Sequence, residues 1–137
     1  MKLNYAPLAI LAVVVLVFAF FAWEQPWTAP HIAGVVIVIP AFVLFALARI
    51  QLGRAFSIQA KATTLVTTGI YSRIRNPIYV FGSLMAVGII IWVNDPRLLL
   101  IFAVIIPMQI YRSRKEEQVL EKKFGAAYLE YKRKTWF

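Results

Sequence analysis

The residues best suited to chemistry lie in two polar segments, of which the C-terminal one spans residues 111–134. If this segment is helical, Arg112 and Glu116 fall one turn apart on the same face, whereas Glu117 points elsewhere. A guanidinium group and a carboxylate on one face can together line a pocket for a charged ligand. The same spacing also produces a plain ion pair on a solvated helix, which is worth only about 0.3–0.5 kcal/mol. The pair alone leaves both interpretations open.

The other segment runs from Gln59 to Gly82 and reads QAKATTLVTTGIYSRIRNPIYVFG. Pro77 suits the first turn of a helix, where its missing N–H costs nothing, and Asn76 just before it is a candidate helix cap. Phenols, amides and guanidinium groups here can bind a polar ligand. A capped membrane helix with interfacial tyrosines and snorkelling arginines has the same composition, so this segment alone is also ambiguous.

Composition excludes several other kinds of site. The chain has no cysteine, which excludes disulfides, cysteine nucleophiles and Cys-ligated metals. One histidine and six acidic residues leave little for a metal site, and no metal is predicted. The histidine, His31, is expected to be a structural residue at a helix start or a membrane interface. The sequence also contains no G-x-G-x-x-G motif of a Rossmann nucleotide site.

The overall composition is that of a membrane protein. Of the 137 residues, 61% are hydrophobic and 15% are charged, whereas soluble domains average about 45–50% and about 25%. A net charge of +9 would suggest nucleic acid in a soluble protein. With this apolar content, membrane lipids are the expected partners and nucleic acid is not. The length allows a single domain, residues 1–137.

Four apolar stretches approach the roughly 20 residues that a helix needs to cross a bilayer. They predict an all-α integral membrane fold with transmembrane helices at about 5–23, 32–48, 78–93 and 98–111. The first stretch is longer than the apolar core of a signal peptide and lacks a small-residue cleavage site, so we expect it to be retained. A loop, 49–76, and a tail, 112–137, complete the chain.

Turn-forming residues predict how the second half of the chain folds. The run Asn94-Asp95-Pro96-Arg97 predicts a tight turn, which makes the last two transmembrane helices an antiparallel hairpin. The tail has helical spacing and should continue the fourth helix beyond the membrane. Gly125 should then end that helix, which lets Tyr128 and Tyr131 fold back.

The basic residues predict the orientation. Fourteen of the 15 Lys and Arg residues fall at the N-terminus, in the 49–76 loop or in the tail, and the other, Arg97, lies in an opposite loop. The positive-inside rule then places both termini and the 49–76 loop in the cytoplasm, with Trp23, Trp27 and Trp92 at the other interface. We expect a multi-pass protein with a cytoplasmic cofactor-binding loop and C-terminal helix, in the inner (plasma) membrane if the cell is prokaryotic.

Taken in order, the two segments resemble the signature of the isoprenylcysteine carboxyl methyltransferase family and its phospholipid N-methyltransferase relatives. Its first part corresponds to Leu65-Val66-Thr67-Thr68-Gly69-Ile70-Tyr71 and to Arg75-Asn76-Pro77-Ile78-Tyr79. Its second part corresponds to Arg112, Glu116-Glu117, Leu120 and the run Phe124-Gly125-Ala126-Ala127-Tyr128-Leu129-Glu130-Tyr131. The resemblance covers about the last 80 residues, and the first two helices match only as apolar spans.

This resemblance implies an integral-membrane methyltransferase that uses S-adenosyl-L-methionine and acts on a lipophilic or lipidated substrate entering from the bilayer. Carried over by position, the cofactor contacts are Gln59, Thr63, Thr64, Leu65, Val66, Tyr71, Asn76, Pro77, Ile78, Tyr79 and Glu116. Arg112 would orient a substrate carboxylate. The sequence departs from the family pattern where Asn76 replaces the histidine of eukaryotic members and where Phe81 replaces a glycine.

Chemistry favours a carboxylate as the methyl acceptor. Methyl transfer from a sulfonium needs alignment, which can contribute about 7–11 kcal/mol, rather than a triad or a metal. A carboxylate is ionised at neutral pH and needs no base, and an arginine fork matches its shape. O-methylation of an isoprenylcysteine-like carboxylate is therefore the favoured reaction.

Two alternatives stay open. The first is N-methylation of a phospholipid or other lipid amine, for which Glu117 is a weak candidate base. The second is a small four-helix transporter or membrane adaptor. Transporters need polar groups deep within their spans, and we expect none in the four spans predicted here.

Overall fold

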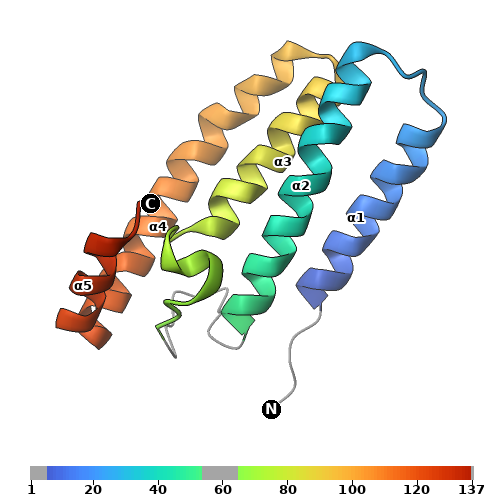
Figure 1. The fold of residues 1–137 in the computed structure, drawn as a ribbon. Coiled ribbons are helices and arrows are strands. Elements are labelled where there is room, and N and C mark those ends of the chain that lie inside the picture. Colours follow the sequence, from blue (N-terminus) through green and yellow to red (C-terminus); the bar gives the residue numbers. More distant parts are fainter. Residues whose placement is uncertain (1–5, 54–64, 137) are drawn as a thin grey trace.

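The computed structural model describes residues 6–53 and 65–136, and every regular element among them is helical. The elements are α1 (Ala6–Trp23), α2 (Ala29–Leu52), the 3-10 helix η2 (Gly69–Ser72), α3 (Pro77–Val93), the 3-10 helix η3 (Pro96–Ile101), α4 (Phe102–Phe124) and α5 (Ala126–Lys134). The four long helices lie side by side, and α5 folds back beside the end of α4 (Figure 1). The all-helical prediction is confirmed for these residues.

Two helical stretches are long and apolar enough to cross a bilayer, namely α2 and the stretch Pro96–Phe124 that η3 and α4 form together. The described part of α1 from Ala12 onward and helix α3 are apolar but shorter. On α2 five of the 24 residues are buried, and on η3 and α4 none is. Val36, Val104 and Met108 are examples of exposed apolar side chains, unlike those of a core helix in a soluble protein. The prediction of four spans, and of their orientation, stays a prediction.

Helices α2 and α3 form the close-packed part of the bundle. Gly34 of α2 lies against α3 so closely that a Cβ there would be 2.7 Å from the carbonyl oxygen of Gly88. A Cβ on Gly88 would in turn lie 2.7 Å from Cγ2 of Val38. Small residues allow helix backbones to approach in this way. This close approach fixes α2 against the C-terminal half of α3.

Helix α2 is longer than predicted, and this corrects the expected start of the loop at residue 49. The helix continues to Leu52 because the first residue to end it is Gly53, which has a φ of +49° and donates its N–H to the Arg49 carbonyl. Arg49 and Gln51 are consequently helical residues. Arg49 is buried, and Gln51 accepts a hydrogen bond from the Ile70 N–H at 2.8 Å, which ties α2 to η2.

The predicted turn between the last two long helices is confirmed. Asn94 ends α3 in the left-handed region with a φ of +58°, and the Asp95 carboxylate accepts from the Arg97 N–H at 3.0 Å. The chain then forms η3 before α4, so the α-helix begins at Phe102 and not near residue 98 as predicted. The Arg97 guanidinium also pairs with Asp95, at 2.7 Å.

The C-terminal part follows the prediction closely. Helix α4 runs without a break to Phe124, and Gly125, with a φ of +52°, ends it. Helix α5 then folds back and buries Tyr128, whose side chain is 1% exposed, together with Tyr131. No side chain of α4 itself is buried.

Candidate functional site

Glu116 lies at the centre of a polar cluster that joins the two segments identified in the sequence. Its Oε1 accepts a hydrogen bond from the Tyr79 hydroxyl at 2.7 Å and another from Nε of Arg112 at 3.1 Å. Tyr79 is in the first turn of α3, 37 residues before Glu116 in the chain. All three side chains are partly buried. The structure thus brings a carboxylate, a guanidinium and a phenol together at one end of the α3–α4 hairpin.

Asn76 links the same two helices one step further toward the end of the bundle. Its side-chain amide donates to the Ser113 hydroxyl of α4 at 3.0 Å. The prediction that the Asn76 side chain caps α3 is wrong, since it makes no capping hydrogen bond. Its backbone carbonyl instead accepts from the N–H groups of Tyr79 and Val80. The Asn76 side chain therefore joins α3 to α4 and does not cap α3.

Tyr71 borders this cluster from η2. Its side chain is 5% exposed, and its hydroxyl has no hydrogen-bond partner among the residues that the structure describes. Burial raises the pKa of the Tyr71 phenol well above its usual value, and the nearby Tyr131, Glu116 and Tyr79 groups add to this effect while Arg49 opposes it. A buried hydroxyl without a partner is a natural contact for a ligand.

The other predicted cofactor contacts divide into two groups. Pro77 is almost fully buried at the start of α3, and Ile78 after it is half-buried. Leu65 and Val66, which precede η2, are also half-buried. Gln59, Thr63 and Thr64 lie outside the described residues. The cofactor-binding role of the whole set stays a prediction.

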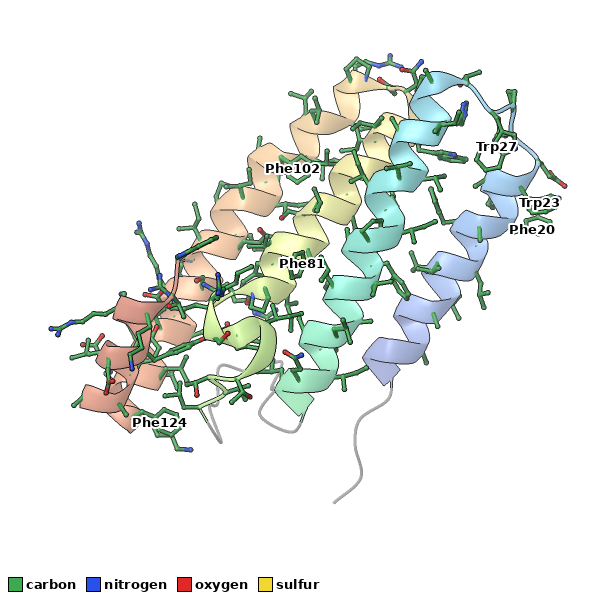
Figure 2. All side chains as sticks on the ribbon, in the orientation of Figure 1. Phe20, Trp23, Trp27, Phe81, Phe102 and Phe124 are labelled. Carbon is green, nitrogen blue, oxygen red and sulfur yellow. The ribbon has the colours of Figure 1, made fainter. Side chains whose placement is uncertain are left out.

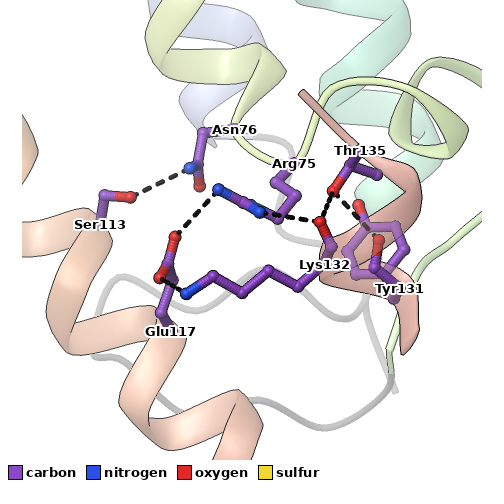
Figure 3. Close-up of polar contacts among 7 residues, drawn as sticks. All are labelled: Arg75, Asn76, Ser113, Glu117, Tyr131, Lys132 and Thr135. Atoms are coloured by element: carbon purple, nitrogen blue, oxygen red, sulfur yellow. Dashed lines mark hydrogen bonds and ion pairs between the residues drawn. The ribbon is translucent and has the colours of Figure 1, made fainter. Parts of the chain in front are cut away.

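Glu117 is directed away from the Glu116 cluster. Its Oε1 lies 3.6 Å from Nη2 of Arg75, and its Oε2 lies 2.9 Å from Nζ of Lys132 (Figure 3). Both oxygens therefore face cations from elements other than α4. This arrangement does not favour the prediction that Glu117 serves as a base beside a ligand at Glu116.

Helix α5 is fastened to the segment that precedes α3. The buried Tyr131 hydroxyl donates to the Tyr71 carbonyl oxygen at 2.7 Å, and the Trp136 N–H donates to the Arg73 carbonyl oxygen at 2.8 Å. Nη1 of Arg75 donates to the Lys132 carbonyl oxygen at 3.2 Å (Figure 3). The C-terminal helix thus covers the backbone on which Tyr71 and Asn76 sit.

The two buried tyrosines of α5 predict a loss of stability at high pH. Burial raises the pKa of Tyr128 and of Tyr131 to about 12, whereas an unfolded tyrosine ionises near pH 10. The charge of Glu117 also raises the Tyr128 pKa, and Arg75 lowers both. Because the folded state favours the protonated phenols, their contribution is complete below about pH 10 and is lost between about pH 10 and 12.

Melting temperatures measured across this pH range should therefore fall, and tyrosinate absorbance should show groups that ionise near pH 12. Tyr128→Phe removes one such group. Between about pH 10 and 12 the melting temperature of this variant should therefore fall by less than that of the wild-type protein. Tyr111→Phe, at an exposed position, is the matched control and should behave as wild type. Equal losses in Tyr128→Phe and wild type would contradict the assignment.

Four residues that sequence analysis did not single out belong to the surroundings of the site. Ser113 and Arg49 contact or adjoin predicted site residues. Ser83 donates to the Gln109 side-chain oxygen at 3.1 Å between α3 and α4, both partly buried. The prediction that the spans contain no polar group is wrong at Ser83 and Gln109. Helical spacing could have revealed them, because Ser83 is one turn from Tyr79 and Gln109 two turns from Glu116.

The opposite end of the bundle contains aromatic residues in place of this polar cluster. Trp23 and Trp27 lie near the α1–α2 connection, far from Phe124 at the other end (Figure 2), and both are strongly exposed. His31 hydrogen bonds to the Thr28 hydroxyl and its ring contacts Trp92 edge-on at 5.5 Å. This is the structural role expected for His31.

Exposed apolar helices, with a polar cluster at one end where α3 and α4 meet, are features of a helical membrane protein. The chain belongs to the phospholipid methyltransferase family, whose family model matches residues 29–127, more than two thirds of the sequence. The match extends the resemblance noted in the sequence back through α2, and it includes Tyr79, Arg112 and Glu116. The protein is therefore a membrane methyltransferase. A comparison with curated proteins gives no match.

Proposed function

We propose that this protein uses S-adenosyl-L-methionine to methylate the carboxylate of a lipophilic, isoprenylcysteine-like acceptor. The observation that carries the proposal is the contact of Tyr79 and Arg112 with one carboxylate, that of Glu116. In this cluster a carboxylate suited to a cationic cofactor lies beside a guanidinium suited to an anionic acceptor. Members of the family generally use this cofactor.

The residues present fit such a cofactor. Glu116 offers a carboxylate for an ammonium group or for ribose hydroxyls, and the buried Tyr71 hydroxyl, which lacks a partner among the described residues, offers a donor and an acceptor. Asn76 adds an amide at the same end of α3. When bound, S-adenosyl-L-methionine supplies a methyl group on a positively charged sulfur, which an acceptor oxygen can attack in line.

The chain's own residues would mainly position the reactants. Arg112 binds the acceptor carboxylate with its planar fork and fixes the oxygen that reacts. Tyr79 holds the Glu116 carboxylate in one orientation through its 2.7 Å hydrogen bond. The acceptor oxygen is already anionic, so no residue has to remove a proton. Helix α5 and the half-buried residues before α3 restrict access of water from the end of the bundle.

A second candidate reaction is N-methylation of a phospholipid or another lipid amine. The description of the matching family, phospholipid methyltransferase, favours it. An amine acceptor must lose a proton before or during transfer. Of the two carboxylates proposed for the site, Glu117 faces Arg75 and Lys132, which favours the carboxylate acceptor over the amine.

We further propose that the chain crosses its membrane four times, the inner (plasma) membrane if the cell is prokaryotic, with both termini and the Glu116 cluster on the cytoplasmic side. The basic residues of α5 and of the end of α4 gather at the end where Phe124 lies, and Trp23 and Trp27 lie at the other (Figure 2). This distribution follows the positive-inside rule and the aromatic belt. A reporter fused to the C-terminus should be cytoplasmic under this proposal.

The reaction can be tested with purified protein, S-adenosyl-L-methionine carrying a radiolabelled methyl group, and either an isoprenylated cysteine or a membrane lipid extract. We expect label in a lipophilic product, and mild base should release it because esters hydrolyse. Base-stable label in phospholipid head groups would support N-methylation instead. A protein that neither binds the cofactor nor transfers label would contradict both reactions.

A further inference from the structure

Three charged residues from separate parts of the chain meet beside α4: Arg75 from the segment between η2 and α3, Glu117 from α4 and Lys132 from α5. We call Arg75, Glu117 and Lys132 the Glu117 triad. Glu117 lies 3.6 Å from the Arg75 guanidinium and 2.9 Å from the Lys132 ammonium, and Arg75 also donates to the Lys132 carbonyl oxygen at 3.2 Å (Figure 3). The triad therefore closes a ring of contacts between the segment just before α3, helix α4 and helix α5.

Two side chains of the triad, those of Arg75 and Glu117, are sheltered from solvent, whereas the Lys132 side chain is 42% exposed. The Lys134–Glu130 ion pair on α5 is more exposed on both sides. The side chains of Arg75 and Glu117 are 17% and 22% exposed, whereas those of Lys134 and Glu130 are 70% and 69% exposed. Exposed pairs contribute little because water and salt screen them. Removing one member of a sheltered pair leaves its partner's charge poorly solvated, and so costs more. In the triad, loss of Glu117 would also leave two cations close together.

The position of the triad connects it to the proposed site through the backbone. Arg75 directly precedes Asn76, whose side chain reaches Ser113, and Ser113 lies one helical turn before Glu117. One turn into α3, Tyr79 reaches Glu116. The start of α3 is thus held to α4 at three neighbouring points, of which the triad alone also holds α5.

We propose that Glu117 is a positioning residue. By holding Arg75 and Lys132 it keeps α5 docked, and it keeps Asn76 and Tyr79 within hydrogen-bonding distance of α4. It touches neither cofactor nor acceptor. This inference rests on the proposed function, because the side chains it positions are those that would bind the cofactor. It replaces the prediction of Glu117 as a base with a role that does not involve proton transfer.

Two variants test the proposal from opposite sides of the triad. Glu117→Gln and Lys132→Met should each weaken binding of S-adenosylhomocysteine, the demethylated cofactor, by about fivefold. The double variant should be little worse than Glu117→Gln alone, since that single change already breaks the contact between Glu117 and Lys132. Lys132→Arg keeps the positive charge and should bind S-adenosylhomocysteine nearly as wild type does, unlike Lys132→Met. Glu130→Gln, which breaks the exposed pair on α5, is the matched control and should bind as wild type.

Two further measurements separate positioning from proton transfer. Hydrogen exchange of the α5 amides should be faster in Glu117→Gln than in Glu130→Gln, with no cofactor present. The pH dependence of kcat in Glu117→Gln should keep its wild-type shape. If that variant binds the cofactor normally but loses a limb of the pH profile, Glu117 is a base and the proposal is wrong.

The outcomes also distinguish this proposal from the proposed function. If wild-type protein binds no cofactor, the proposed function fails, and the site-positioning role of Glu117 fails with it. The exchange rates of α5 would still show whether Glu117 docks this helix. If α5 exchanges equally fast in Glu117→Gln and Glu130→Gln, the triad does not hold α5 and the inference is overturned even when cofactor binding is intact.

Discussion

Glu116→Ala is expected to weaken binding of S-adenosyl-L-methionine by about a hundredfold or more, and to abolish methyl transfer. The substitution removes the carboxylate that accepts from Tyr79 at 2.7 Å and from Arg112 at 3.1 Å. Charge-assisted hydrogen bonds are about twice as strong as neutral ones, so loss of this acceptor should exceed the effect of any single neutral contact. Isothermal titration calorimetry with the cofactor and with its demethylated product measures the change.

A matched control separates this effect from a general change in α4. Glu121→Ala removes an exposed carboxylate from the same helix and should bind the cofactor as wild type. Glu116→Gln keeps an oxygen that can accept from Tyr79 but loses the charge, and should fall between wild type and Glu116→Ala. Unchanged affinity in Glu116→Ala would remove Glu116 from the cofactor site.

Arg112→Ala is expected to reduce turnover by about a hundredfold while changing cofactor affinity only slightly. The Arg112–Glu116 pair is a partly exposed i, i+4 contact, and such pairs contribute about 0.3–0.5 kcal/mol. Glu116 also keeps its hydrogen bond to Tyr79 when Arg112 is removed. Misplacement of an acceptor by about 1 Å, in contrast, can cost a hundredfold in rate. Steady-state kinetics with the lipid acceptor and calorimetry with the cofactor measure the two effects separately.

The conservative variant sharpens this test. Arg112→Lys keeps a positive charge but not the planar fork, so its turnover should lie between those of wild type and Arg112→Ala. Arg114→Ala, at an exposed position on the same helix, should leave both quantities unchanged. Equal losses of cofactor affinity and turnover in Arg112→Ala would mean that Arg112 supports Glu116 and does not bind the acceptor.

Sequence patterns predicted the parts of the site that depend on spacing within one helix. Arg112 and Glu116 share a face because they are four residues apart, and Glu117 points elsewhere for the same reason. Gly125 ends α4 because a positive φ suits glycine. The meeting of Tyr79 and Glu116 was predictable only through the resemblance to a family, since no local rule brings residues 37 positions apart together.

Other features depended on partners that no local pattern specifies. Asn76 has the residue type and position of a helix cap, but the nearby Ser113 hydroxyl competes for its amide, and that neighbour is visible only in three dimensions. Arg49 was assigned to the 49–76 loop because the predicted apolar stretch ends at residue 48, yet the helix continues until Gly53. The Ser83–Gln109 contact was missed because each residue alone is a minor interruption of an apolar run.

The difference between the two sides of α3 has a consequence for handling the protein. Helix α2 meets α3 through glycines, whereas α4 has no buried side chain and reaches α3 through Asn76, Tyr79 and Ser83. Apolar side chains of α4 such as Val104 and Met108 point outward. In a bilayer, lateral pressure from acyl chains would keep α4 in place, a force that small detergent micelles supply poorly. Preparations in lipid discs should therefore retain the native α3–α4 spacing longer than preparations in short-chain detergent.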